Sequence, residues 1–117
     1  MPQYMLLLYA PEAEGEELAH RETEMPLWLE LNRSLEEAGV LVANGRLHPT
    51  ATATTVTAVG GETELIDGPF AITKEVLVGY YLVDVANLDE ALRVAGRIPL
   101  TRYGRVEVRP IMDLPGD

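Results

Sequence analysis

The sequence predicts an α+β fold, a ferredoxin-like sandwich with an inserted β-hairpin and with its helices on one face of an antiparallel sheet. A length of 117 residues suits a single domain over residues 1–117. The patterns along the chain follow the order strand, helix, strands with a hairpin, strand, helix, strand. Two apolar strands, residues 5–9 and 77–83, are too continuous to be covered on one face only. We therefore expect a homodimer in which a second protomer covers the other sheet face.

The first third of the chain is expected to form a strand, a helix and a second strand. Residues 3–9 are almost continuously apolar and aromatic, which is typical of a buried strand. Thr23 is a suitable N-cap for a helix over residues 23–38, and Gly39 should end that helix in a left-handed conformation. A strand over residues 40–47 should follow, interrupted by an Asn-Gly pair. The inward stripe of the helix should be Trp28, Leu31, Leu35 and Ala38.

The middle of the chain predicts a β-hairpin. Residues 51–59 alternate Thr with small apolar side chains, which favours a strand. Gly60 and Gly61 then form the tight turn into residues 62–66, because such a turn requires positive φ at its corner.

The last third predicts a central strand, a helix and an edge strand. Residues 77–85 form the most apolar strand, and residues 105–112 alternate cleanly. Between them, Asn87 and Glu90 resemble a capping pair for a helix up to Arg97. Its inward stripe should be Leu88, Ala91 or Leu92, Ala95 and Ile98, and the helix should end before Pro99.

Composition excludes several classes of function. Nine Lys and Arg against 19 Asp and Glu give a net charge of −10, the wrong sign for a nucleic-acid partner. The absence of cysteine excludes disulfides and thiolate metal sites. The sequence contains no pattern of a membrane span or leader, so we expect a cytoplasmic protein without a membrane partner. His20 and His48 lack the carboxylate spacing of a metal site, so we expect no metal and no cofactor.

The segment Asp67–Phe70, followed by Thr73–Glu75 and Gly79–Tyr81, resembles the signature of the DGPF group of YCII-related proteins. Further matching segments extend the resemblance over nearly the whole chain. It implies the dimeric α/β barrel fold, in which two ferredoxin-like protomers pack sheet to sheet. It also implies a His and Asp pair in a cleft, but the positions that register with this pair hold Trp28 and Ile98. We therefore do not transfer the dyad.

Four polar residues are candidates for a catalytic or binding site. Asp67 and Lys74 can form a polar pair at the rim of a cleft, with Asp67 as a base or Lys74 holding an anion. Alternatively, Asp67 accepts amide hydrogen bonds within a loop while Phe70 fills the core. Tyr103 precedes the last strand and can orient a carbonyl, and His48 can act as a lone general base if its loop folds over the cleft.

Two other pairs of aromatic or charged residues have plainer interpretations. Tyr80 and Tyr81 should point to opposite sheet faces because strand side chains alternate. Glu107 and Arg109 share a face and are expected to form a surface or intersubunit ion pair.

Two functions are compatible with these residues. The first is a cofactor-independent enzyme acting on a small carbonyl or lactone-like compound, the chemistry of relatives on the same fold. The second is a noncatalytic small-ligand-binding or regulatory module, linked through the resemblance to extracytoplasmic-function sigma factors. A haem- or metal-dependent protein fits less well, since histidine is scarce.

Overall fold

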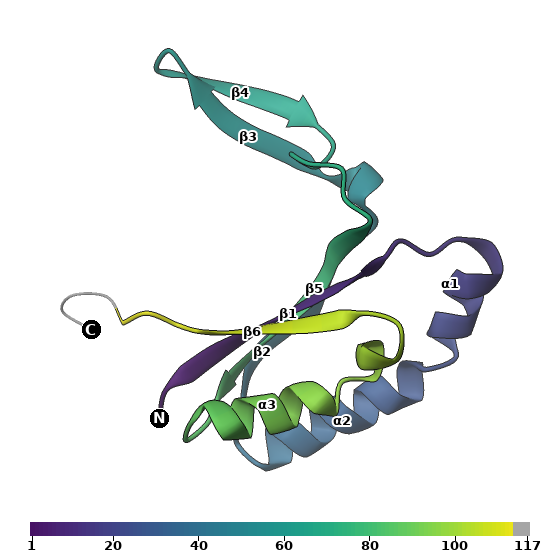
Figure 1. The fold of residues 1–117 in the computed structure, drawn as a ribbon, viewed down its shortest axis with the longest axis vertical. Helices are drawn as coiled ribbons and strands as arrows, with labels where there is room; N and C mark the ends of the chain where they lie inside the picture. The colour runs from purple at the N-terminus through teal and green to yellow at the C-terminus, as the bar shows by residue number, and fades with distance from the viewer. Residues whose placement is uncertain (114–117) are drawn as a thin grey trace.

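A computed structural model describes residues 1–113 of the protein as a mixed α+β structure with antiparallel sheets (Figure 1). Four strands form the larger sheet in the order β2-β5-β1-β6, which is compatible with a ferredoxin-like fold. These strands are β1 (Gln3–Pro11), β2 (Leu41–Arg46), β5 (Glu75–Asp84) and β6 (Arg105–Pro110). A separate two-stranded sheet, β3 (Thr54–Val59) with β4 (Glu62–Asp67), projects away from it.

Helices cover one face of the larger sheet. Helices α2 (Met25–Glu37) and α3 (Leu88–Gly96) lie side by side along this face (Figure 1). Side chains that alternate along β1 and β5 pack beneath them, and Leu6 and Val83 are fully buried. The core contributed by the two helices consists of Leu31, Leu35, Ala91, Val94 and Ala95.

The other face of the larger sheet carries apolar side chains with no helix over them in the described part of the chain. On this open face the alternate residues of β1, Met5, Leu7 and Tyr9, are only half-buried. Tyr80 also belongs to this face, whereas Tyr81 is 2% exposed under the helices, so the expected opposition of the two tyrosines is confirmed.

Strand β6 completes the sheet as an edge strand. Its Val106 and Val108 pair with buried residues of β1 and face the helices. Glu107 and Arg109 lie on the open face, and their expected ion pair is present at 3.7 Å.

The helix boundaries confirm one predicted cap and correct another. The Asn87 side chain accepts a hydrogen bond from the Glu90 backbone amide at 3.0 Å, as expected for the N-cap of α3. Thr23, the predicted cap of α2, instead follows an additional helix, α1 (Gly15–Glu22), and Glu24 precedes α2. Helix α1 buries no side chain, so it leaves no apolar stripe in the sequence.

The predicted inward stripes were only partly right. On α2, Ala38 lies outside the helix and is exposed. On α3, Leu88 and Leu92 are 47% and 48% exposed, while Val94 is buried instead. The buried stripe of α3 is narrow and consists of Ala91, Val94 and Ala95. The small side chains of Ala91 and Ala95 let this short helix pack closely on the sheet.

Glycines explain where the strands turn and where they continue. Gly39 ends α2 with φ of 73°, and Gly60 and Gly61 form the hairpin turn at 59° and 85°, as predicted. The predicted interruption of β2 at its Asn-Gly pair was wrong, because β2 continues through Gly45. There a Cβ would lie 2.9 Å from Cε1 of Tyr80, so the missing side chain makes room for the ring.

The segment around the projecting hairpin differs most from expectation. Residues 50–52 form a short 3-10 helix, η1 (Thr50–Thr52), before β3. Phe70, expected in the core, is 90% exposed, because residues 68–74 run outside the sandwich. A second 3-10 helix, η2 (Pro99–Arg102), begins at the predicted stop after α3.

Among residues 1–113, none of the helices is both long enough and apolar enough to span a membrane.

Candidate functional site

A recess of about 640 Å³ lies where β1 ends and where β5 and β6 begin. This volume falls within the ~300–1,000 Å³ typical of small-molecule sites. Three elements of the sheet meet there with the end of η2. The recess is lined by Pro11, Lys74, Glu75, Thr101, Arg102, Tyr103, Gly104 and Arg105.

Tyr103 is held in place by an arginine from α1. The guanidinium carbon of Arg21 lies 4.2 Å from the centre of the Tyr103 ring, a cation–π contact. Arg21 also donates a hydrogen bond to the carbonyl oxygen of Pro11 at 2.9 Å, which ties α1 to the end of β1. Burial raises the pKa of the Tyr103 phenol above its ordinary value, with Arg21 opposing the rise and Glu24 adding to it. The hydroxyl is therefore protonated at neutral pH and can donate a hydrogen bond to a carbonyl oxygen.

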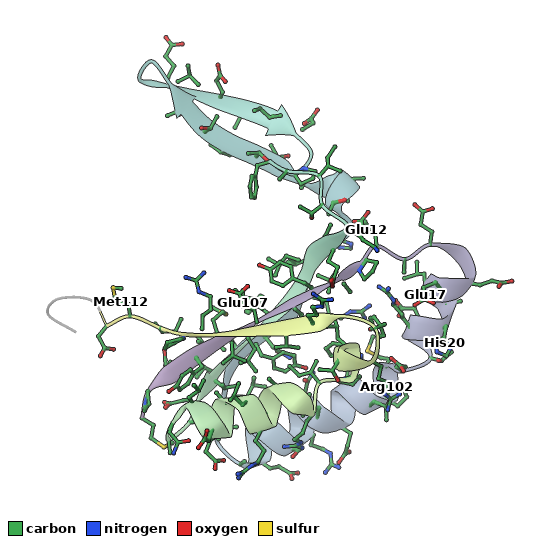
Figure 2. The ribbon with its side chains drawn as sticks, viewed as in Figure 1. Glu12, Glu17, His20, Arg102, Glu107 and Met112 are labelled. Atoms are coloured by element: carbon green, nitrogen blue, oxygen red, sulfur yellow. The ribbon has the colours of Figure 1, made fainter. Side chains whose placement is uncertain are left out.

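A buried carboxylate pairs with one of the arginines that line the recess. Glu24 is only 9% exposed, and its Oε2 accepts a hydrogen bond from Arg102 at 2.9 Å. Its Oε1 is buried without a hydrogen-bond partner among the described residues. Figure 2 shows Arg102 at the same end of the molecule as Glu17 of α1. The pair therefore joins the start of α2 to η2 beside the recess.

The recess has the opposite charge to the protein as a whole. Lys74, Arg102 and Arg105 line it with one carboxylate, Glu75, whereas the chain carries a net charge of −10. Arg105 Nε lies 3.5 Å from Glu75, and Lys74 forms no ion pair within residues 1–113. Both Arg105 and Lys74 are exposed, so their charges are available to a ligand.

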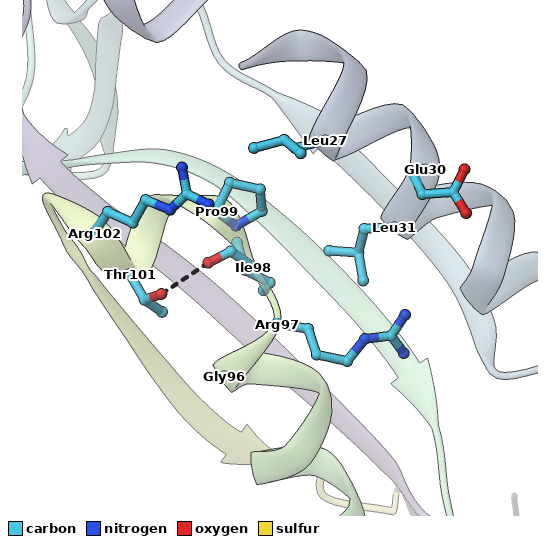
Figure 3. A pocket seen from close by; sticks show the side chains of 9 residues that line it. All are labelled: Leu27, Glu30, Leu31, Gly96, Arg97, Ile98, Pro99, Thr101 and Arg102. Carbon is cyan, nitrogen blue, oxygen red and sulfur yellow. Dashed lines mark hydrogen bonds between the residues drawn. The ribbon is translucent and has the colours of Figure 1, made fainter.

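A second hollow, between α2 and the end of α3, is less suited to a ligand (Figure 3). Its volume is about 270 Å³, just under the ~300 Å³ at which small-molecule pockets begin. Leu27, Leu31, Ile98 and Pro99 form much of its wall. Ile98 is fully buried, so this hollow is chiefly a seam between packed helices.

The structure brings together two of the four predicted site residues. Lys74 and Tyr103 line the same recess. Asp67 ends the projecting strand β4, and His48 lies in the exposed loop after β2; neither is among the residues that line the recess. The positions that register with the dyad are apolar here as well. The rings of Trp28 and Tyr81 stack with their centroids 6.4 Å apart, and Ile98 packs in the core.

Sequence reasoning missed the arginines of this region. Arg102 and Arg105 flank the predicted Tyr103, and such a concentration of cations in an acidic chain is a signal that could have marked the segment. Arg21 and Glu24 carried no comparable signal, because they meet residues about 80 positions later only in the folded chain. Within residues 1–113, no three His, Asp or Glu side chains gather as a metal site would require.

Residues 2–115 match the family described as the YCII-related domain. The chain belongs to the YCII-related family. The YCII-related chain is also 48% identical over 85 residues to a protein of Rhizobium meliloti (strain 1021), an alignment that covers 69% of this chain and 67% of the relative. That relative is named only as an uncharacterised protein.

Proposed function

We propose that this YCII-related protein binds a small carbonyl or lactone-like compound that carries a negative charge, and acts on it without a cofactor. The observation that carries the proposal is the recess in which Lys74, Arg102 and Arg105 surround Tyr103. Cations that line a concave site attract anions and raise their local concentration. A carboxylate-bearing ligand is therefore favoured here in spite of the acidic chain.

Each residue of the recess has a role in this proposal. Lys74 and Arg105 hold the anionic group, since Lys74 has no ion-pair partner within the described residues and Arg105 is mostly exposed. The protonated hydroxyl of Tyr103 donates a hydrogen bond to the carbonyl oxygen and polarises it. In this proposal Glu75, the one carboxylate that lines the recess within residues 1–113, accepts a proton.

The proposal includes membership of the DGPF group and a homodimer of dimeric α/β barrel type. The run from Asp67 to Phe70 supports the group. The open face of the sheet supports the dimer: Met5, Leu7 and Tyr80 are apolar and only half-buried there. Packing this face on its copy would remove apolar surface from water, and Glu107 and Arg109 can pair across a two-fold axis.

A noncatalytic ligand-binding or regulatory module, linked to extracytoplasmic-function sigma factors, is the second candidate. It is favoured by the position of Asp67 and His48, the two predicted bases, outside the lining of the recess. The positions of the family dyad hold Trp28 and Ile98, neither of which can transfer a proton.

Levulinate, a small keto acid, is a suitable probe of binding. Valerate lacks its ketone and methyl propyl ketone lacks its charge, so the three compounds separate the two interactions. We expect levulinate to shift the backbone amide resonances of Lys74 and Tyr103. Lys74→Gln should weaken levulinate binding by roughly tenfold, the value of about one charge-assisted hydrogen bond.

Arg93→Gln is the matched control, because Arg93 pairs with Glu90 on the exposed surface of α3. It should leave levulinate affinity unchanged. Equal binding of methyl propyl ketone and levulinate would show that charge plays no part and would contradict the proposal. Hydrolysis of 5-oxotetrahydrofuran-2-carboxylate, a lactone that carries a carboxylate, would favour the enzyme if Tyr103→Phe abolishes it. Binding of levulinate without turnover of this lactone would favour the regulatory module.

A further inference from the structure

Glu24 is a buried carboxylate that has no role in the proposed function. Its backbone is fixed at the start of α2, because its amide donates to the carbonyl oxygen of Arg21 at 3.0 Å and its carbonyl oxygen accepts from the amide of Leu27 at 2.8 Å. Within residues 1–113 its side chain forms a hydrogen bond only with Arg102. Burial of a carboxylate is costly unless a donor is bound to it. Arg102 is therefore the partner that makes the burial of Glu24 possible.

The side chain of Arg102 is held at both ends. Its backbone belongs to η2, whose Pro99 and Leu100 are buried. The amide of Tyr103 donates to the carbonyl oxygen of Leu100 at 3.0 Å, so the turn closes directly after Arg102. At the other end, Nη1 of Arg102 donates to Oε2 of Glu24 at 2.9 Å. A long side chain that is held in this way has few conformations left to lose when it binds a ligand.

The guanidinium of Arg102 keeps most of its donors free. Nη1 supplies the bond to Glu24, whereas Nε and Nη2 form no hydrogen bond within the described residues. The side chain of Arg102 is 62% exposed, although that of its partner is only 10% exposed. Nε and Nη2 donate in parallel, a geometry that matches the two oxygens of a carboxylate. Because Arg102 lines the recess, a carboxylate bound there can meet these two donors.

The pair of Glu24 and Arg102 is poorly built for stability alone. A buried ion pair stabilises a fold only when its remaining donors and acceptors are also satisfied. Oε1 of Glu24 is buried without a hydrogen-bond partner among the described residues. The guanidinium is largely exposed, so solvent screens part of the attraction. The clearer effect of the pair is to fix the position of the guanidinium.

The pair also lies beside the tyrosine of the recess. Arg102 directly precedes Tyr103 in the chain, and both line the recess. Burial raises the pKa of the Tyr103 phenol, and the negative charge of Glu24 adds to this rise, so the carboxylate is near the ring. The proposed function places the ligand carbonyl at this phenol. A carboxylate a few atoms away in the same ligand would therefore lie close to Arg102.

We propose that Arg102 binds the carboxylate of the ligand through two parallel hydrogen bonds and that Glu24 is the positioning residue that holds Arg102 for this contact. The inference rests on the proposed function and deepens it, because a planar carboxylate is selected over other anions. The cations of the recess then have different roles. Lys74, which has no ion pair within residues 1–113, attracts the anion. Arg102, whose charge is balanced by Glu24, sets the orientation of the ligand.

Glu24→Gln distinguishes a positioning residue from a charge that is merely nearby. If Glu24 acted only through its charge, its loss would strengthen levulinate binding, because a negative group repels an anion. If it positions Arg102, its loss frees that side chain and weakens binding. We expect the levulinate dissociation constant to rise about two- to tenfold, the usual cost of ordering one long side chain on binding.

Glu30→Gln is the matched control for this substitution. Glu30 also pairs with an arginine, Arg33, but on the exposed surface of α2, and it is not among the residues that line the recess. It should change the levulinate dissociation constant by less than about twofold, as expected for a residue that does not touch the ligand.

Arg102→Lys tests the paired donors, because lysine keeps the positive charge and lacks the parallel N–H groups. It should raise the levulinate dissociation constant about tenfold, the value of about one charge-assisted hydrogen bond. Arg97→Lys is its control. Arg97 donates to Oγ of Ser34 at 2.8 Å and lines the second hollow instead of the recess, so its replacement should leave levulinate affinity unchanged.

NMR of the arginine side chains in the unmodified chain is the second measurement, and it does not depend on the folding of a variant. The bond to Glu24 should slow rotation of the Arg102 guanidinium, so that its Nη protons give separate signals without any ligand. Levulinate should shift the Nε–H resonance of Arg102, and methyl propyl ketone, which has no carboxylate, should not.

The outcomes separate this inference from the proposed function. Averaged Nη signals for Arg102 in the unmodified chain would overturn the inference and leave anion binding at Lys74 intact. Unchanged or tighter levulinate binding in Glu24→Gln would do the same. A wild-type chain that does not bind levulinate would overturn the proposed function and the inference together.

Discussion

Replacing Gly104 by Ala is expected to destabilise the protein, because the space beside Gly104 is already occupied. An added Cβ would lie 2.3 Å from the carbonyl oxygen of Tyr9 and 2.8 Å from Cδ2 of Leu100. It would also lie 3.0 Å from Cβ of Ala10. Leu100 and Ala10 are 1% and 0% exposed, so neither can move aside into solvent.

The size of the effect follows from the displacement required. Ordinary contacts of a Cβ begin near 3.4 Å, so Gly104 and Tyr9 must separate by roughly 1 Å. Tyr9 pairs with Arg105 in the ladder between β1 and β6, and this separation strains that ladder. Overpacking of this kind costs about 1–3 kcal/mol of unfolding free energy. For a domain of this length, the cost lowers Tm by about 5–15 °C.

Urea unfolding followed by circular dichroism measures the free energy, and a thermal melt at one fixed protein concentration measures Tm. Gly96→Ala is the matched control: a Cβ there meets nothing within 4 Å, and α3 gains helix propensity. That variant should be stabilised by up to about 1 kcal/mol. If Gly104→Ala melts at or above the wild-type temperature, the argument from crowding is refuted. A loss in Gly96→Ala as large as that in Gly104→Ala would refute it too.

Two further predictions concern a titration and a helix cap. Because burial raises the pKa of Tyr103, the phenolate absorbance that disappears in Tyr103→Phe should have its midpoint above the ordinary ~10, and Arg21→Gln should raise it further. The stability linked to this phenol is complete below pH ~10 and is lost as pH rises through the folded pKa; a midpoint at or below the ordinary value would contradict the burial of Tyr103. Asn87→Ala should lower the unfolding free energy by about 1 kcal/mol, because the Glu90 amide loses its hydrogen-bond acceptor. Asn87→Asp should retain most of this stability, since aspartate also caps helices. If urea unfolding shows equal losses for the two variants, the cap has no role.

The strands and the larger helices were predictable because their signals are local. The alternation of β6 between Val106 and Glu107 appears in the sequence as it does in the sheet. Asn87 and Gly39 mark helix ends through the backbone conformations and hydrogen bonds that their types favour. Helix α1 was missed because it buries no side chain, and a helix without an apolar stripe leaves no period to detect.

The candidate site was predictable only in part. Lys74 and Tyr103 attracted attention as unusual residues next to turns and strand starts, and both line the recess. Asp67 belongs to the same sequence cluster as Lys74, but it ends the projecting β3–β4 hairpin and is not among the residues that line the recess. Phe70 was expected in the core on hydrophobicity alone, although its segment runs outside the sandwich.

Pattern along the chain was therefore enough to establish an antiparallel α+β protein with an open, apolar sheet face, because periodicity records which side of each element meets the core. The recess depended on contacts that no local pattern records. Arg21 reaches Tyr103 and Glu24 reaches Arg102 only when α1, α2 and η2 meet beside the end of β1. Such contacts are specified by the relative positions of elements, and those positions follow from packing of the whole core.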